Sequence, residues 1–194
     1  QSVVRSIDIT APDGTMHAYE TIRTAGRVPD KFKLNWVGGI FTSVSEDWHW
    51  DNGTRLVTKL ETFRLPDPRS AGPAGVIQLG GLELGRGERL RATRFDGHLV
   101  YVVTFFQIDP LWVVDVSNPS APRIAGSVDV PGWSTFIQPL GSQLVTIGIE
   151  SNRVAVSLFD VRNPARPALL DRVRLGQTFS WSEANWDEKA FSVL

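Results

Sequence analysis

The sequence contains no cysteine, which excludes disulfides, thiolate metal sites and cysteine nucleophiles. It also lacks any run of about 18 apolar residues, the length that a membrane-spanning helix needs. Basic and acidic residues are nearly balanced, 20 against 21, so the net charge of −1 attracts neither nucleic acid nor anionic lipid. His17, His49 and His98 lie far apart and match no metal-ligand spacing, although a mixed His/carboxylate site assembled from distant segments stays open. We therefore expect no cofactor, no resident metal and no nucleic-acid partner.

Local enzyme motifs are missing as well. The chain has no Gly-x-Ser-x-Gly nucleophile elbow, no His-Glu-x-x-His zinc motif and no EF-hand loop. The glycine-rich segment Gly80–Gly87 lacks the Gly-Lys-Ser/Thr ending of a phosphate-binding loop, so we discount it as a nucleotide site. These absences disfavour an enzyme without excluding one whose residues converge from distant parts of the chain.

What the sequence does contain is a repeat of 45 residues. The segment Asp115–Pro122, with the pattern Asp-Val-x-Asn-Pro-x-x-Pro, returns as Asp160–Pro167. The apolar runs Leu111–Val114 and Val156–Phe159 precede the two copies at the same spacing. A weaker partial copy links Phe95–Val100 to Trp186–Phe191, and a divergent earlier copy is Trp36–Phe41. A repeat of this length indicates similar structural units that stack on one another.

Each repeat has the same succession of strand patterns. The run His98–Phe105 is rich in β-branched and aromatic residues and predicts a strand buried on both faces. The next run is Leu111–Val116, and an Asn-Pro turn follows it. A half-exposed outer strand then places Ile124, Val128 and Val130 on one face. One further strand precedes each buried run, at Arg89–Phe95 and at Ser134–Leu140.

Four strands per 45 residues without a convincing helix are typical of a β-propeller blade. We predict an all-β fold, a β-propeller fragment of four-stranded antiparallel blades, with about three full blades and two partial ones in one domain over residues 1–194. The full blades span 32–84, 88–130 and 132–176, and the partial blades span 2–26 and 178–194. Insertions interrupt the first full blade at 45–54, a long hairpin tip, and at 66–75, a loop rich in proline and glycine.

Several segments together resemble the bacterial and archaeal secreted β-propeller family, the C-terminal β-propeller proteins distantly related to WD40 repeats. They are Tyr101–Phe105, Asp109–Val116, Pro131–Phe136, Ser157–Val161, Ser180–Ala184 and Asp187–Phe191. The resemblance is strong over 88–194 and extends more weakly back to about residue 15. It implies the propeller fold, a longer protein, and a location outside the cell, in the periplasm or at the cell envelope. It transfers no functional residue, because no activity is established for the family.

The most unusual local feature is Trp48-His49-Trp50 on the predicted hairpin tip. Aromatic side chains displayed on a loop stack on sugars or anchor a protein partner. The other interpretation is that they fold back over a neighbouring blade. The following Asn52–Thr54 segment contains a formal glycosylation sequon, but Asn-Gly is also the preferred tight hairpin turn, and we favour the turn.

A second candidate site uses the innermost strands, which line the channel of a propeller. By the repeat alignment we place Arg91, Arg94, Glu183 and Asn185 on such strands. They would form a polar ligand site at the channel mouth, or else an ordinary solvated wall with ion pairs.

The repeated acids Asp115 and Asp160 also allow two interpretations. They would form repeated carboxylate or metal sites, or each would accept hydrogen bonds from the backbone of its own turn. Repetition favours the turn, since a structural need recurs in every blade.

We expect a non-enzymatic interaction or scaffold protein of the cell envelope that presents loops to a protein or glycan partner. The alternative is a propeller enzyme, a hydrolase or lyase, with its polar site at the channel mouth, and a third possibility is a purely structural domain. Neither end reads as a natural terminus: Gln1–Arg5 is no signal peptide, and both it and Lys189–Leu194 look like the middle of a strand. We expect cuts through a larger protein, whose open strand edges pair with the rest of that protein or with another chain.

Overall fold

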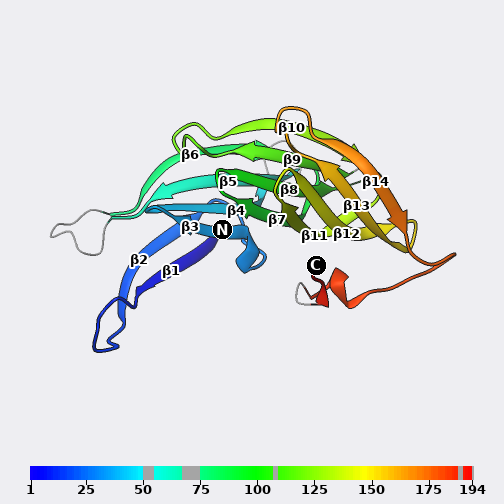
Figure 1. Cartoon of the computed structure of the whole chain (residues 1–194). Coiled ribbons are helices and arrows are strands. Elements are labelled where there is room, and N and C mark those ends of the chain that lie inside the picture. Colours follow the sequence, from blue (N-terminus) through cyan, green and yellow to red (C-terminus); the bar gives the residue numbers. More distant parts are fainter. Residues whose placement is uncertain (50–54, 67–74, 107–108, 188–189, 194) are drawn as a thin grey trace. The chain divides into compact units, whose positions relative to one another are not determined.

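The computed structural model describes residues 1–49, 55–66, 75–106, 109–187 and 190–193 (Figure 1). Its elements are β1 (Ser2–Asp8), β2 (His17–Thr24), η1 (Lys31–Lys33), β3 (Leu34–Val37), β4 (Ile40–His49), β5 (Arg55–Arg64), β6 (Ile77–Leu84), β7 (Arg89–Asp96), β8 (Leu99–Phe105), β9 (Asp109–Asp115), β10 (Arg123–Val130), β11 (Trp133–Leu140), β12 (Gln143–Glu150), β13 (Arg153–Asp160), β14 (Ala168–Arg174) and η2 (Glu183–Asn185). The prediction of an all-β fold is confirmed, because the only helices among these residues are two short 3₁₀ turns.

The strands form three four-stranded sheets and one two-stranded sheet, and all neighbours are antiparallel. The four-stranded sheets are β3–β6, β7–β10 and β11–β14, each with its strands side by side in chain order. They lie within the ranges 32–84, 88–130 and 132–176 given by the repeat. The two-stranded sheet β1–β2 lies within 2–26. This order follows from antiparallel pairing of successive strands, because an antiparallel hairpin can be closed by only a few connecting residues.

The chain divides into two compact units. One unit consists of Gln1–Arg86 with Asn118–Pro122, and the other of Gly87–Ser117 with Arg123–Leu194. In the first unit, sheet β1–β2 and sheet β3–β6 share an apolar core around Ile22, Phe41 and Phe63. The rings of Phe41 and Phe63 lie 6.1 Å apart.

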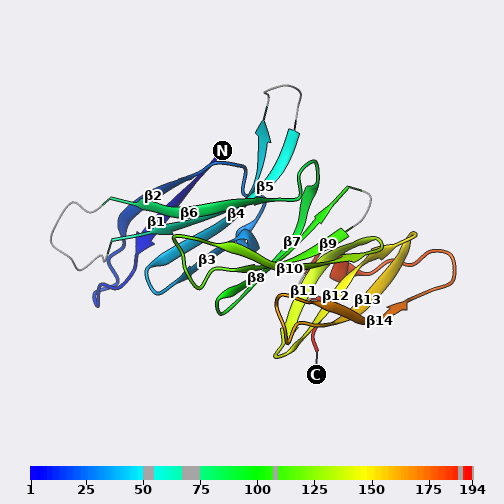
Figure 2. The same cartoon turned by 90° about the horizontal axis from the view of Figure 1, so that it is seen from above.

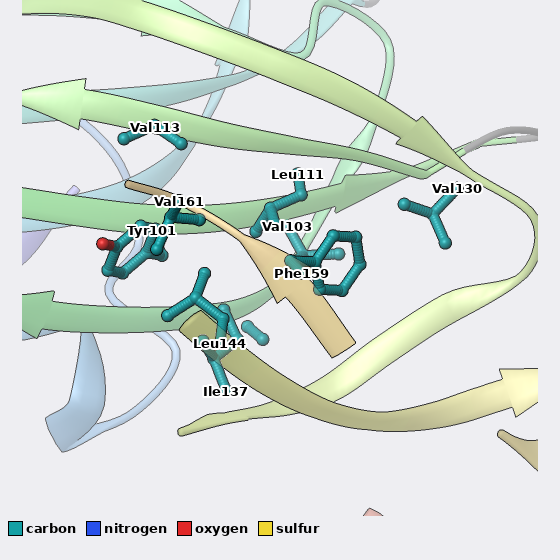
Figure 3. Close-up of a cluster of buried hydrophobic side chains, with 10 residues drawn as sticks. Tyr101, Val103, Leu111, Val113, Val130, Ile137, Leu144, Phe159 and Val161 are labelled. Atoms are coloured by element: carbon teal, nitrogen blue, oxygen red, sulfur yellow. The ribbon is translucent and has the colours of Figure 1, made fainter. Parts of the chain in front are cut away.

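In the second unit, the core lies between sheets β7–β10 and β11–β14. Figure 3 shows side chains from both sheets pointing toward one another, with Tyr101, Leu111 and Phe159 among the largest. Each of these three is at most 1% exposed. Burying a large apolar side chain stabilises a fold by roughly 1.5–3 kcal/mol, so this cluster is a principal source of stability in the unit.

The Asp-Val-x-Asn-Pro-x-x-Pro segments are turns that connect the third and fourth strands of their sheets. The second of them packs on the fourth strand of the preceding sheet, where Gly126 lies. A Cβ added to Gly126 would lie 2.5 Å from the carbonyl oxygen of Pro164 and 2.9 Å from Cδ of Pro167. In the first unit, Gly80 lies under Pro119 and Pro122 in the same way: an added Cβ would lie 2.8 Å from the Pro119 carbonyl oxygen and 2.8 Å from Cδ of Pro122. The repeat is therefore a turn together with the glycine that makes room for it.

Two expectations about strands are wrong. The described residues of 178–194 form no strand but the 3₁₀ turn η2, so the strand expected through Ala190–Val193 is absent. The second concerns β10, where a bulge at Ala125 breaks the alternation. Ile124 is consequently 42% exposed, while Ala125, Val128 and Val130 belong to the core. A bulge inserts one extra residue and so moves the side chains beyond it to the other face.

Candidate functional site

The hairpin β4–β5 extends past the rest of its sheet. Its two strands of 10 residues pair all the way to His49 and Arg55. On one side β3 pairs only with Ile40–Ser43, and on the other side the pairing with β6 stops at Thr58. We call the extension formed by residues 47–49 and 55–57 the β4–β5 arm; Figure 2 shows it leaving the sheet.

The arm presents Trp48 to solvent. The indole side chain is 44% exposed, whereas Leu56, its partner across the hairpin, is 6% exposed. The backbone ladder therefore holds a large aromatic side chain in an accessible position without a flexible loop. Trp50 and Asn52–Thr54 lie outside the described residues, so the second tryptophan and the turn or sequon stay predictions.

His49 belongs to a cluster of charges on β4, β5 and β6. Its Nε2 lies 3.2 Å from Oδ2 of Asp47 and 4.0 Å from Oε1 of Glu83. The ammonium group of Lys59 lies 2.9 Å and 3.7 Å from the same two oxygens. Burial alone lowers the pKa of Lys59, but the hydrogen bond and charge of Asp47, with the charges of Glu83 and Glu61, raise it overall. His49 therefore faces this cluster rather than forming one displayed patch with Trp48.

Arg91 and Arg94 lie on β7, as the repeat alignment predicts. Arg91 occupies a bulge, and its guanidinium lies 5.5 Å from the ring centre of Phe105 and 5.6 Å from that of Trp133. These contacts are cation–π interactions, and they hold the Arg91 side chain against two aromatic faces. Arg94 is half-buried and pairs across the sheet with Tyr101.

Glu183 and Asn185 do not lie on a strand, and that placement is wrong. They belong to η2, which Ser182 caps by accepting a hydrogen bond from the Ala184 backbone N–H. Asn185 is buried at 6% exposure, and its Nδ2 donates to Oγ1 of Thr135 at 3.2 Å, whereas Glu183 is exposed. In β11, Thr135 occupies the bulge that corresponds to the Arg91 bulge in β7.

No hydrogen bond or ion pair in the described part of the chain joins either arginine to Glu183 or Asn185. The channel-mouth ligand site therefore stays a prediction, and so does the enzyme alternative that depends on it.

The interpretation of Asp115 and Asp160 as turn residues is confirmed. Asp115 accepts a hydrogen bond from the Ser117 backbone N–H, and Asp160 accepts one from Arg162, each at 2.9 Å. Hydrogen bonds from Ser117 and then the nearby Arg123 guanidinium lower the pKa of Asp115. No group of three or more metal-ligating side chains occurs among the described residues.

The first unit contains a cavity that was not predicted from the sequence. It has a volume of about 800 Å³, and Arg5 and Arg23 are among its lining residues. The spacing of two residues shows that Val3 and Arg5 share one face of their strand, and that Thr21 and Arg23 share one face of theirs. The convergence of this face with Phe63 and Gln78 was not readable, since it depends on how sheet β1–β2 packs on sheet β3–β6.

Antiparallel four-stranded sheets that repeat every 45 residues define a protein built from propeller blades. The match to the family described as "Beta propeller domain" covers residues 1–194, and the chain belongs to this family. No helix among the described residues is long and apolar enough to cross a membrane.

Two curated relatives are both archaeal and carry names that state no function. An uncharacterized protein of Methanocaldococcus jannaschii is 39% identical over 119 residues, which are 60% of this chain and 18% of the relative. An uncharacterized protein of Archaeoglobus fulgidus is 33% identical over 168 residues, which are 86% of this chain and 24% of the relative. The chain therefore spans less than a quarter of the length of either relative.

Proposed function

We propose that this chain is a non-enzymatic interaction module of the cell envelope and that the β4–β5 arm binds a protein or glycan partner through Trp48. The observation that carries the proposal is the exposed indole on a fully paired two-stranded extension. Tryptophan is enriched among the residues that contribute most to binding energy, and its flat face also stacks on sugar rings. The envelope location is supported by the family resemblance alone.

The geometry of the arm supports recognition in two ways. Because Trp48 lies in a paired strand, its backbone loses little conformational freedom when a partner binds, which lowers the entropic cost of association. The charge cluster lies at the base of the arm, where Lys59 on β5 bridges Asp47 on β4 and Glu83 on β6. These ion pairs stiffen the base of the arm. An anchor of this kind is preorganised rather than ordered on contact.

The test compares Trp48→Ala with Trp181→Ala, which removes an indole that is 58% exposed in the other unit. Both variants and the unchanged chain are used as baits for envelope extract and are applied to a glycan array. We expect Trp48→Ala to weaken the recovered interaction at least about tenfold, as for a central aromatic anchor, while Trp181→Ala retains it. Equal binding by Trp48→Ala and the unchanged chain, with both variants folded, would overturn the assignment of the arm.

A further inference from the structure

The cavity at Arg5 and Arg23 is formed by four strands and one adjoining residue of the first unit. Sheet β1–β2 contributes one face, and β5, β6 and the residue before β6 contribute the rest. The lining residues are Val3, Arg5, Thr21, Arg23, Phe63, Val76 and Gln78. Its volume of about 800 Å³ lies within the usual range of small-molecule sites, roughly 300–1,000 Å³.

Two guanidinium groups share the wall of this cavity. Strand pairing sets Arg23 opposite Val3 and Arg5 opposite Thr21, so the arginines are diagonal neighbours on one face. Diagonal neighbours lie about 7–8 Å apart at the backbone, within reach of each other's long side chains. Within the described ranges no ion pair joins either arginine to a carboxylate, so both guanidinium groups are free to bind an anion.

The carboxylate that Gln78 contacts, Glu61, already has other partners. Glu61 is 5% exposed and does not line the cavity. Its Oε2 accepts a hydrogen bond from the Ala25 backbone N–H at 2.8 Å, and its Oε1 accepts one from Nε2 of Gln78 at 3.3 Å. Gln78 is thereby oriented at the edge of the cavity, and Glu61 is not placed to pair with the arginines.

Of the remaining lining residues, Val3, Phe63 and Val76 are apolar, and Thr21 and Gln78 are polar. Phe63 is 3% exposed and belongs to the core cluster against which Val76 also packs. A cavity with two cationic groups above an apolar floor suits a ligand that combines an anionic group with an apolar body. Arginine is the side chain best matched to a planar carboxylate, because it donates two parallel hydrogen bonds.

We propose that this cavity binds a small organic carboxylate, with Arg5 and Arg23 holding the carboxylate and Val3 and Val76 contacting the apolar part. Thr21 adds a hydroxyl and Gln78 an amide at the rim. The site is separate from the β4–β5 arm and does not depend on the function proposed for Trp48.

The test uses 2-naphthoate as the probe and isothermal titration calorimetry of the full chain. We expect saturable binding of 2-naphthoate, binding of the uncharged 2-naphthamide at least about tenfold weaker, and little binding of inorganic phosphate. Equal binding of naphthoate and naphthamide would contradict recognition of the anion. Equal binding of phosphate and naphthoate would contradict the apolar floor.

The residues are tested with Arg5→Gln and Arg23→Gln, each of which removes one charge from an exposed strand position. Each change should weaken naphthoate binding about tenfold or more, in line with the loss of a charge-assisted hydrogen bond. Arg89→Gln is the matched control, since Arg89 is an exposed strand arginine in the other unit. Thermal unfolding shows whether the variants fold. Unchanged binding in folded Arg5→Gln and Arg23→Gln would overturn the proposal, as would an equal loss in Arg89→Gln.

Discussion

Strands β10 and β14 occupy the same place in their sheets but differ at one residue. Each is the fourth strand and carries a bulge at the same point, Ala125 in β10 and Leu170 in β14. The residue after the bulge is Gly126 in β10 and Asp171 in β14. Gly126 lies beneath the turn of the next sheet, whereas Asp171 is exposed. The backbone bulge is therefore common to both strands, whereas glycine follows the bulge in the strand on which a proline turn packs.

The largest effect should come from filling the space above Gly126. In Gly126→Ala the new Cβ would meet the Pro164 carbonyl oxygen at 2.5 Å, a backbone atom that moves only with its turn. We expect a loss of about 2–3 kcal/mol in the free energy of unfolding, typical of overpacking. This loss outweighs the gain expected because alanine loses less backbone entropy than glycine on folding. Urea unfolding measures it.

Asp171→Ala is the comparison for this change. Because Asp171 is exposed, we expect the free energy of unfolding of the Asp171→Ala variant to stay within about 0.5 kcal/mol of the value for the unchanged chain. Similar losses in Gly126→Ala and Asp171→Ala would mean that the turn does not depend on the glycine, and the comparison between β10 and β14 would fail.

The turn acids Asp115 and Asp160 also differ between the two sheets, and they hold the turns that pack on such glycines. Asp115 is 8% exposed and pairs with Arg123 at 2.5 Å, whereas Asp160 reaches Arg162 at 3.3 Å from a more open position. Asp115→Ala should therefore cost about 1.5–3 kcal/mol, typical of losing hydrogen bonds to a charged group. Asp160→Ala should cost about 1 kcal/mol or less. Chemical denaturation of both variants tests this order, and a larger loss in Asp160→Ala would reverse it.

The sequence predicted the repeated parts of the fold well and the contacts between them poorly. The strands of β7–β10 and β11–β14 followed from apolar runs and from the Asn-Pro turns, because these signals are local. The bulge that exposes Ile124 was hidden, since no local pattern distinguishes Ala125 as the extra residue. The 3₁₀ turn at Glu183 was misread as a strand from a weak resemblance to an earlier copy.

The candidate functional residues also fall into a part that the sequence predicted and a part that it did not. Trp48 was found as an unusual residue in a hairpin, which is a local signal. The cavity of Arg5 and Arg23 was not found, because Phe63 and Gln78 come from strands far along the chain. Single residues are readable from a sequence, whereas cavities require the packing of one sheet on another.

The smallest effect concerns pH and contrasts a buried acid of the first unit with the turn acid of the second. Burial raises the pKa of Glu61, although the Ala25 backbone N–H and the charge of Lys59 oppose the shift. The pKa of Asp115 is instead lowered, by the hydrogen bonds from Ser117. A raised pKa in the folded state means that Glu61 contributes most stability below its ordinary pKa of 4.5 and loses that contribution as the pH rises through the folded value.

Glu61→Gln should therefore abolish this loss, because the amide stays uncharged. We expect the free energy of unfolding of the unchanged chain to fall relative to Glu61→Gln as the pH rises from below 4.5 through the raised pKa of the folded state. Asp115→Asn should behave in the opposite sense, because a lowered pKa stabilises the fold above the ordinary value of 3.8 and is lost as the pH falls through the folded value. Parallel pH profiles of the unchanged chain and Glu61→Gln would show that burial of this carboxyl does not affect folding. The two acids would then differ in their contacts and not in their contribution to stability.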